Sequence, residues 1–192
     1  MCGGEGSRLR PAVGDTEKPL VTVGGEPMID RVVAALQASS LTTIAAAVSP
    51  STPETATRLA EIDCVEVIET AGEGYVADLN DALADLNRPT VTVAADLPLL
   101  TADHIDRAVT AAGDDSLSIC VPASLSEQLG LSAEPTVEYD GKRVVPTGLN
   151  IVGDDAERTA VWRNLRLAFN INRPADYQIV EVWLDCDTQT KI

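Results

Sequence analysis

The sequence of 192 residues is poor in aromatic side chains, lysine and histidine. Phe, Trp and Tyr together make up 3% of it, and 14 basic residues face 30 acidic ones, for a net charge of −16. A surface this acidic repels nucleic acid and anionic membranes, so we expect neither as a partner. Many acidic residues with few lysines also predict adaptation to high salt, where screening weakens the self-repulsion.

Paired cysteines and long apolar runs are also missing. No run approaches the roughly 20 apolar residues of a membrane span. The cysteines are far apart, unlike those of a zinc site or a disulfide framework, and stand at Cys2, Cys64, Cys120 and Cys186. We expect them to be small buried side chains in a reducing cytoplasm. The single histidine, His104, falls in a polar helix start, which predicts a solvated side chain rather than a catalytic base.

The length and the 45% apolar content fit one folded α/β domain over residues 1–192, without linker or repeat. Strand and helix patterns alternate, which predicts three αβα layers around a mainly parallel sheet. Strands are predicted at 20–23, 43–48, 65–68, 90–95, 117–121, 149–152 and 167–171. Helices are predicted at 27–39, 52–62, 75–86, 102–112, 156–162 and after residue 174. The pattern lapses over 123–135, and Asp140-Gly141 predicts a hairpin between 137–139 and 143–146.

The segment Cys2-Gly3-Gly4-Glu5-Gly6-Ser7-Arg8-Leu9 is the strongest functional signal. Glycines let successive backbone N–H groups point into one concavity that binds anionic oxygens. Arg8 and the later Lys18 add two cations that can close on the same phosphates. The alternative is a poorly ordered N-terminus. Ser7-Arg8 after the last glycine excludes a Walker loop, and too little chain precedes the glycines for a dinucleotide fingerprint.

Gly-Gly-x-Gly-x-Arg followed by Glu17-Lys18-Pro19 resembles the signature of nucleotidyltransferases with a Rossmann-like, GT-A-like fold. That resemblance implies a loop around the triphosphate of an incoming nucleotide. In the resembling enzymes, an apolar first strand of about five residues leads into the loop. Here Met1 and Cys2 precede the glycines, so we expect the first strand to be truncated and the natural protein to start about five residues upstream.

Asp96 follows a predicted buried strand, and ligands meet open α/β sheets at the carboxyl ends of their strands. A carboxylate at that place can hold Mg²⁺, which bridges phosphate oxygens. The alternative is a turn-forming aspartate before Leu97-Pro98. The triphosphate loop in the same chain favours the metal.

Further segments narrow the resemblance, and they stand in the order Ser49–Thr55, Glu69–Asn80, Ala94–Leu97, Val145–Val152 and Phe169–Asn172. Together they resemble the archaeal CobY-type GTP:adenosylcobinamide-phosphate guanylyltransferases. The resemblance implies transfer of GMP from GTP to a corrinoid phosphate during cobalamin nucleotide-loop assembly. It makes GTP and that phosphate the expected partners, Mg²⁺ the expected metal, and a homodimer a possible assembly.

The residue types and the resemblance together assign roles. Gly3, Gly4 and Gly6 would hold the β- and γ-phosphates, Arg8 the pyrophosphate, Lys18 the α-phosphate or acceptor phosphate, and Asp96 the metal. Further expected nucleotide-binding residues are Ser49, Thr52, Thr70, Gly72, Gly74, Gly148 and Asn172. Three have structural alternatives: a helix cap for Thr52 and Asn172, and close backbone approach for Gly148.

Three other functions stay open. A molybdenum-cofactor guanylyltransferase would share the loop and the nucleotide but use a pterin acceptor. A sugar-phosphate nucleotidyltransferase fits less well, because those chains usually carry longer acceptor regions. A GTP-binding relative without turnover is opposed by the joint presence of Arg8, Lys18 and Asp96. For the corrinoid, the segments 123–135 and 139–143 are the expected shelf.

Overall fold

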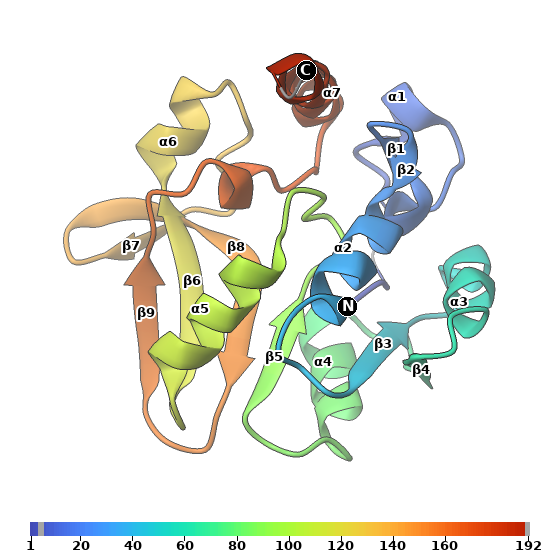
Figure 1. The fold of residues 1–192 in the computed structure, drawn as a ribbon, viewed down its shortest axis with the longest axis vertical. Coiled ribbons are helices and arrows are strands. Elements are labelled where there is room, and N and C mark those ends of the chain that lie inside the picture. The colour runs from blue at the N-terminus through green and yellow to red at the C-terminus, as the bar shows by residue number, and fades with distance from the viewer. Residues whose placement is uncertain (4–5, 191–192) are drawn as a thin grey trace.

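The computed structural model describes residues 1–3 and 6–190. In Figure 1 the strands follow one another across the molecule in the order β9, β6, β8, β5, β3 and β4. Helices α2 and α5 lie in front of this layer and α4 lies behind it, which gives the expected three layers.

The strands are β1 (Thr22–Val23), β2 (Glu26–Pro27), β3 (Ile44–Val48), β4 (Val65–Glu69), β5 (Thr90–Val93), β6 (Ser116–Pro122), β7 (Val137–Tyr139), β8 (Lys142–Val152) and β9 (Glu157–Val161). The α-helices are α1 (Arg10–Val13), α2 (Met28–Gln37), α3 (Pro53–Ala60), α4 (Tyr75–Leu83), α5 (Ala102–Ala112), α6 (Ala123–Gln128) and α7 (Pro174–Thr190). Two 3₁₀ turns, η1 (Lys18–Leu20) and η2 (Arg166–Ala168), complete the described elements.

Strand directions confirm the α/β class. β3 pairs with β4 in parallel, and β6 pairs with β9 in parallel. β8 runs antiparallel to both β5 and β6, so β5, β6 and β9 share one direction. The predicted hairpin is also confirmed, since β7 pairs antiparallel with β8 around Asp140-Gly141.

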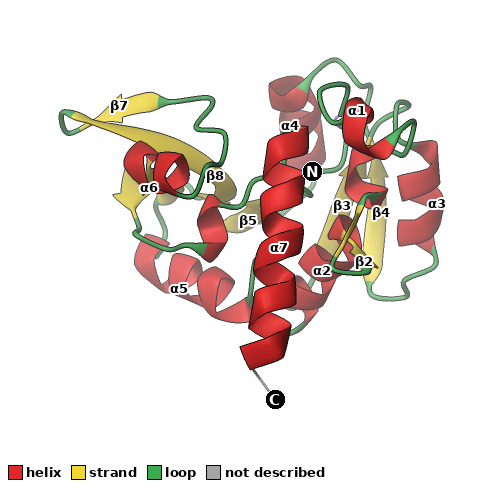
Figure 2. Ribbon diagram, turned by 90° about the horizontal axis from the view of Figure 1, so that it is seen from above, coloured by secondary structure: helices red, strands yellow, loops and turns green. Residues whose placement is uncertain are grey.

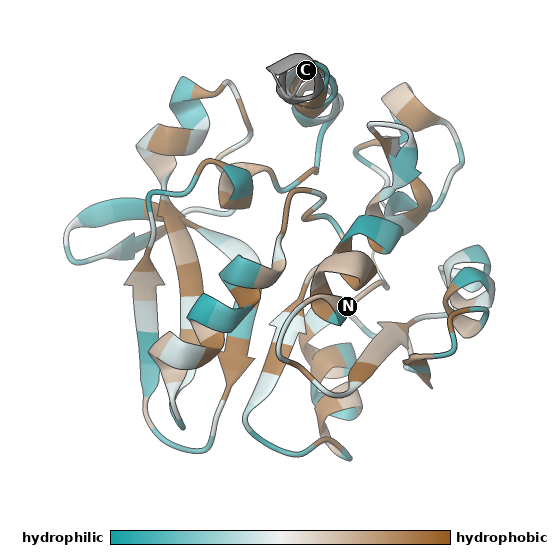
Figure 3. Cartoon of the chain, viewed as in Figure 1, coloured by the Kyte–Doolittle hydropathy of each residue, from teal (hydrophilic) through white to brown (hydrophobic). Residues whose placement is uncertain are grey.

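The apolar core occupies both sides of the strand layer. Figure 3 shows hydrophobic colouring on the central strands and hydrophilic colouring on the β7–β8 hairpin. The largest fully buried side chains include Phe169, Leu149 and Ile119. Helix α7 crosses the molecule and contacts α1 and β1 (Figure 2), so the C-terminal helix holds the N-terminal segment in place.

Two predicted elements were wrong. Residues 156–162 were expected to form a helix but contain β9, because Glu157–Val161 finds a parallel partner in β6. Backbone pairing at a sheet edge overrides the weak helix preference of this segment. Residues 167–171 were expected to form a strand but contain a 3₁₀ turn and irregular chain. Their apolar side chains are buried, and burial alone does not distinguish a strand from a packed loop.

Other expectations need smaller corrections. The lapsed region 123–135 contains α6, and the predicted strand 20–23 is reduced to β1. Cys2 and Cys120 are buried as expected, whereas Cys64 and Cys186 are exposed. Every helix in the described part of the chain is too short or too polar to cross a bilayer.

His104 is not solvated, as the sequence suggested, but 8% exposed. It stands three residues after Thr101 in a capping box at the start of α5, and Nε2 lies 2.8 Å from Nδ2 of Asn164. Desolvation is the main reason why the pKa of His104 is lowered, and the charge of Arg166 adds to this effect. The residue therefore has a structural role at the helix start.

The first residues of the chain lie between β3 and β5 and connect them. Met1 donates its terminal ammonium to Val93 O (2.9 Å) and accepts from Ala95 N (3.2 Å). Cys2 N donates to Ala47 O at 2.8 Å. Backbone bonds to both neighbours place Gly3, the first loop glycine, at the carboxyl ends of the two strands.

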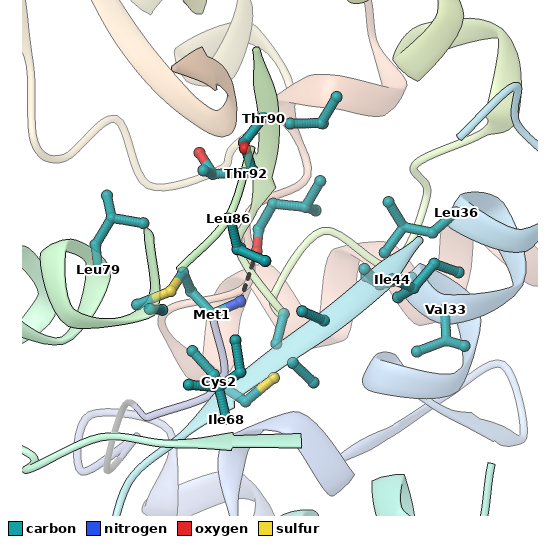
Figure 4. Close-up of a pocket in the computed structure, with 18 of the residues that line it drawn as sticks. Met1, Cys2, Val33, Leu36, Ile44, Ile68, Leu79, Leu86, Thr90 and Thr92 are labelled. Atoms are coloured by element: carbon teal, nitrogen blue, oxygen red, sulfur yellow. Dashed lines mark hydrogen bonds between the residues drawn. The ribbon is translucent and has the colours of Figure 1, made fainter. Parts of the chain in front are cut away.

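An apolar cavity of about 90 Å³ lies beneath Met1, between β3, β5, α2 and α4 (Figure 4). Val33, Ile44 and Leu83 contribute to its lining. Thr92 also lines it, and the Thr92 Oγ1 atom is buried without a hydrogen-bond partner in the described part of the chain. The terminal ammonium of Met1 is thus partly buried beside an apolar void.

An apolar extension of about five residues at Met1 is expected to stabilise the fold, because it can fill this cavity and pair with β3 and β5. A void of about 90 Å³ corresponds to about 2 kcal/mol, and we expect the melting temperature to rise by about 4–8 °C. Thermal melting should be compared with that of a Gly-Ser extension of equal length. Equal melting of the two forms would contradict the prediction.

Candidate active site

A cavity of about 370 Å³ opens where β3, β4 and β5 end. Its lining combines backbone, cationic and acidic groups from segments that are distant in the sequence. Among the expected site residues, it brings together Gly3, Lys18, Thr70, Gly72, Gly74 and Asp96. Residues that were not expected also line it, and Tyr75 and Asp78 are the most polar of these.

Lys18 and Asp96 form the central ion pair of the site. Lys18 Nζ donates to Asp96 Oδ2 at 2.5 Å and to Asn172 Oδ1 at 2.7 Å. Both charged side chains are 15% exposed, so solvent screens the pair only weakly. An ammonium has three donors, and these two bonds leave one for a ligand oxygen.

The environment of Asp96 fits a bound Mg²⁺ ion. Its second oxygen, Oδ1, is buried and accepts no hydrogen bond from any described residue. Mg²⁺ prefers oxygen ligands and is commonly held by one or two carboxylates together with substrate phosphates. The described residues contain no cluster of three acidic, cysteine or histidine side chains that would form a protein-only metal site. Asp96 could therefore hold the ion together with phosphate oxygens.

Glu17 anchors the Lys18 segment to helix α3. Its carboxylate accepts from Glu54 N (2.8 Å), Thr55 N (2.7 Å) and Thr55 Oγ1 (2.5 Å). These amides belong to the first turn of α3, where backbone donors lack partners inside the helix. Glu17 thus caps α3 and holds Lys18 in position. Sequence reasoning missed this role, although an acidic residue beside Lys18 was visible.

Three hydroxyls that are expected to contact nucleotide donate hydrogen bonds to backbone carbonyls. Thr70 Oγ1 donates to Val48 O (2.9 Å), and Thr52 Oγ1 donates to Ser49 O (3.2 Å). Ser49 Oγ donates to Gly3 O at 3.2 Å, so it steadies the start of the glycine loop. Thr52 is 1% exposed and makes no side-chain cap bond to α3, whose cap is Glu17. Of the three, Thr70 lines the cavity.

The glycines of the N-terminal loop differ in their position relative to the cavity. Gly3 lines the cavity, and Gly4 lies outside the described residues. Gly6 has φ +61°, and a Cβ on it would lie 2.6 Å from Lys18 Cβ, so the loop packs closely on that lysine. Arg8 is exposed and is not among the described residues that line the cavity.

Asn172 is oriented by a buried carboxylate that sequence reasoning did not identify. Asp176, which is 1% exposed, accepts from Asn172 N (3.1 Å) and Arg173 N (2.8 Å). It also accepts from Ser132 N (2.7 Å) and Ser132 Oγ (2.8 Å). The cap at the start of α7 is therefore Asp176, and the Asn172 side chain is free to contact Lys18.

Tyr75 lies at the start of α4, beside the cavity. Desolvation is the main cause that raises its pKa, and the negative charge of Asp96 raises it further. Tyr75 is half exposed, and like an ordinary tyrosine with a pKa of about 10 it is protonated at neutral pH and can donate a hydrogen bond. Neither effect was visible in the sequence, because Tyr75 and Asp96 meet only through the fold.

The family model of the MobA-like NTP transferase domain matches residues 1–168. The chain is 29% identical to the adenosylcobinamide-phosphate guanylyltransferase of Methanocaldococcus jannaschii, over 97% of this chain and 96% of that protein. It is 25% identical to the bifunctional protein GlmU of Rhodospirillum rubrum, over 87% of this chain but 36% of that protein.

Solved structures share the fold at lower identity. The CTP:phosphocholine cytidylyltransferase of Streptococcus pneumoniae superposes with a TM-score of 0.68 at 15% identity, covering 95% of this chain and 96% of that one. The inositol-1-phosphate CTP transferase of T. maritima gives a TM-score of 0.62 at 14% identity, covering 93% and 92%. These likenesses show the fold alone.

Replacing Gly148 by alanine is expected to destabilise the protein. Gly148 has φ +89°, and a Cβ on it would lie 2.8 Å from Ala94 Cβ, two residues before Asp96. We expect the free energy of unfolding to fall by about 2–5 kcal/mol, from backbone strain and overpacking together. Gly141→Ala is the control, since Gly141 in the two-residue hairpin turn also has positive φ but open space around it; there we expect about 1–2 kcal/mol. Equal losses in urea unfolding would contradict the close approach.

Proposed function

Because the chain belongs to the MobA-like NTP transferase family, and so to the nucleotidyltransferases, we propose that it transfers GMP from GTP to adenosylcobinamide phosphate. The observation that carries the proposal is the Lys18–Asp96–Asn172 array beside Gly3, with one buried oxygen of Asp96 unpartnered. The acceptor is proposed from the relative in M. jannaschii, which aligns over nearly the whole chain.

The proposed reaction needs no general base in the protein. The acceptor phosphate is already an anion at neutral pH, since its second pKa is about 6. Its oxygen attacks the α-phosphorus of GTP, and the bond to the β-phosphate oxygen breaks to release pyrophosphate. Catalysis then consists of alignment and neutralisation of charge, which agrees with the structural role of His104.

Each charged group of the site has a part in that scheme. Lys18 directs its remaining ammonium donor to the α-phosphate or the acceptor phosphate, and Asn172 and Asp96 fix its position. Mg²⁺ held by Asp96 Oδ1 would neutralise charge on the phosphates. Gly3 and Gly6 flank the backbone that would hold the β- and γ-phosphates, with Arg8 closing on the pyrophosphate.

The β7–β8 hairpin and the α6 region are the proposed corrinoid shelf. The hairpin and α6 border a cavity of about 840 Å³, whose lining includes Ala123, Tyr139, Lys142, Arg143 and Arg163. Its lining also contains Glu127 and Asp140, and Arg143 pairs with Glu127 at 3.2 Å. We therefore assign Lys142 and Arg163 as the cations that would meet the acceptor phosphate. The family description favours one rival, a molybdenum-cofactor guanylyltransferase with a pterin acceptor.

Acceptor assays separate these functions. We expect pyrophosphate release from GTP with adenosylcobinamide phosphate in high salt, and only background release with molybdopterin or a sugar phosphate. We also expect ATP, CTP and UTP to be poor donors. Turnover with the pterin alone would establish the rival function. Tight GTP binding without release on any acceptor would indicate a non-catalytic relative.

Asp96→Asn is expected to lower kcat by about a hundredfold or more, because one preorganised charge at the reacting phosphates is lost. The melting temperature should also fall, because Lys18 loses its counter-charge, so kcat is compared at a temperature where both proteins are folded. GTP binding without metal should change much less than kcat, since asparagine preserves the shape. Asp103→Asn, at an exposed position in the first turn of α5, is the control and should leave kcat unchanged. Survival of activity in Asp96→Asn would mean that Asp96 only forms a turn.

A further inference from the structure

Asp78 is a nearly buried carboxylate in the wall of the nucleotide cavity. It lies in the first turn of α4, is 5% exposed, and lines the cavity together with Gly3 and Gly72. Asp78 and Asp96 are the carboxylates among the described lining residues. Lys18 neutralises Asp96, whereas Asp78 has no role in the scheme above.

One oxygen of Asp78 is fixed by the backbone. Oδ1 accepts from Gly72 N at 2.9 Å and from Glu73 N at 3.2 Å. These two bonds hold the loop that precedes α4 and set the plane of the carboxylate. The second oxygen is therefore aimed in one direction by the fold.

That second oxygen is an acceptor without a partner. Oδ2 lies 3.6 Å from the place of a Cβ on Gly3, at the cavity wall, and no described residue donates a hydrogen bond to it. Oδ2 retains contact with solvent, so a ligand that displaces water from it must supply a donor in its place. A nucleotide that enters the cavity can supply that donor.

The phosphates of the nucleotide do not supply this donor, because their ionised oxygens are acceptors. They would also place a second negative charge against the nearly buried Asp78 carboxylate. A planar base suits this wall, since Gly72 and Gly74 present backbone without side chains. Guanine carries N1–H and N2–H donors on one edge, whereas adenine carries an acceptor at N1. We propose that Asp78 Oδ2 accepts a hydrogen bond from this edge of guanine and selects GTP over ATP. The inference rests on the proposed function and names its specificity residue.

Asp78→Asn tests the proposal because the loop dictates how asparagine sits. The amides of Gly72 and Glu73 are donors, so they retain the amide oxygen and place Nδ2 where Oδ2 was. The Nδ2–H donor of asparagine would face the 2-amino donor of guanine, and the two donors cannot bond. Xanthine has a carbonyl acceptor at C2, which can accept from Nδ2. By isothermal titration calorimetry, we expect GTP affinity to fall about 10- to 100-fold and XTP to bind more tightly than GTP.

The control is Asp81→Asn, an exposed position on the same helix, which should leave both affinities unchanged. If Asp78 contacts ribose instead, Asp78→Asn would weaken GTP, ITP and ATP by one common factor, and this would overturn the proposal. Should the variant not fold, the wild-type protein still decides the matter. ITP, which lacks the 2-amino group of guanine, must then bind at least tenfold more weakly than GTP, and equal binding would overturn the proposal.

Binding is measured without acceptor, so the two hypotheses fail differently. Normal GTP binding and an unchanged base preference in Asp78→Asn would overturn the role of Asp78 and leave the proposed function standing. A switch to XTP without GMP transfer to the corrinoid phosphate would overturn the proposed function alone. A wild-type protein that binds no GTP would overturn both.

Discussion

The ion pair between Lys18 and Asp96 joins segments 78 positions apart, and the site is arranged around it. Removing one partner of a pair so little exposed would leave an uncompensated charge, which costs about 3–5 kcal/mol. Other parts of the fold hold the pair in place: Glu17 ties the lysine segment to α3, and Ile171 N donates to Asp96 O at 3.0 Å. The same pair that constrains the fold leaves one ammonium donor and one carboxylate oxygen for a ligand.

Three carboxylates, of which two are buried and Glu17 is partly exposed, hold backbone in this acidic chain. Glu17, Asp78 and Asp176 each accept from two or more backbone N–H groups near the start of a helix. Backbone donors at helix starts stabilise negative charge, so these side chains avoid the repulsion that the net charge of −16 would otherwise cause. The hydroxyl of Thr70 donates to the carbonyl of Val48, the last residue of β3. The groups that remain available to a ligand in the cavity include the third ammonium donor of Lys18 and the unpartnered oxygens of Asp96 and Asp78.

The sequence predicted site residues best where a residue of the right chemical type directly follows a motif or a predicted strand. Lys18 and Asp96 were selected by residue type and by their place after a motif and a strand, and the structure brings them together with Asn172. It failed where the outcome depends on a distant partner. Residues 157–161 pair with β6, and His104 is buried against Asn164. Neither partner can be inferred from the local pattern, because both lie more than a helix length away in the sequence.

The sequence by itself determined the α/β class, the largely parallel strand order, and the glycine, lysine and aspartate positions that indicate phosphate chemistry. These follow from hydrophobic periodicity and residue type, which act over a few neighbouring residues. Only the tertiary structure decided which polar groups are already satisfied and which remain free. Thr52 and Thr70 direct their hydroxyls to backbone, whereas Asp96 Oδ1 and Asp78 Oδ2 have no donor among the described residues. That difference arises because hydrogen bonds form between atoms that the fold places within about 3 Å, whatever their separation along the chain.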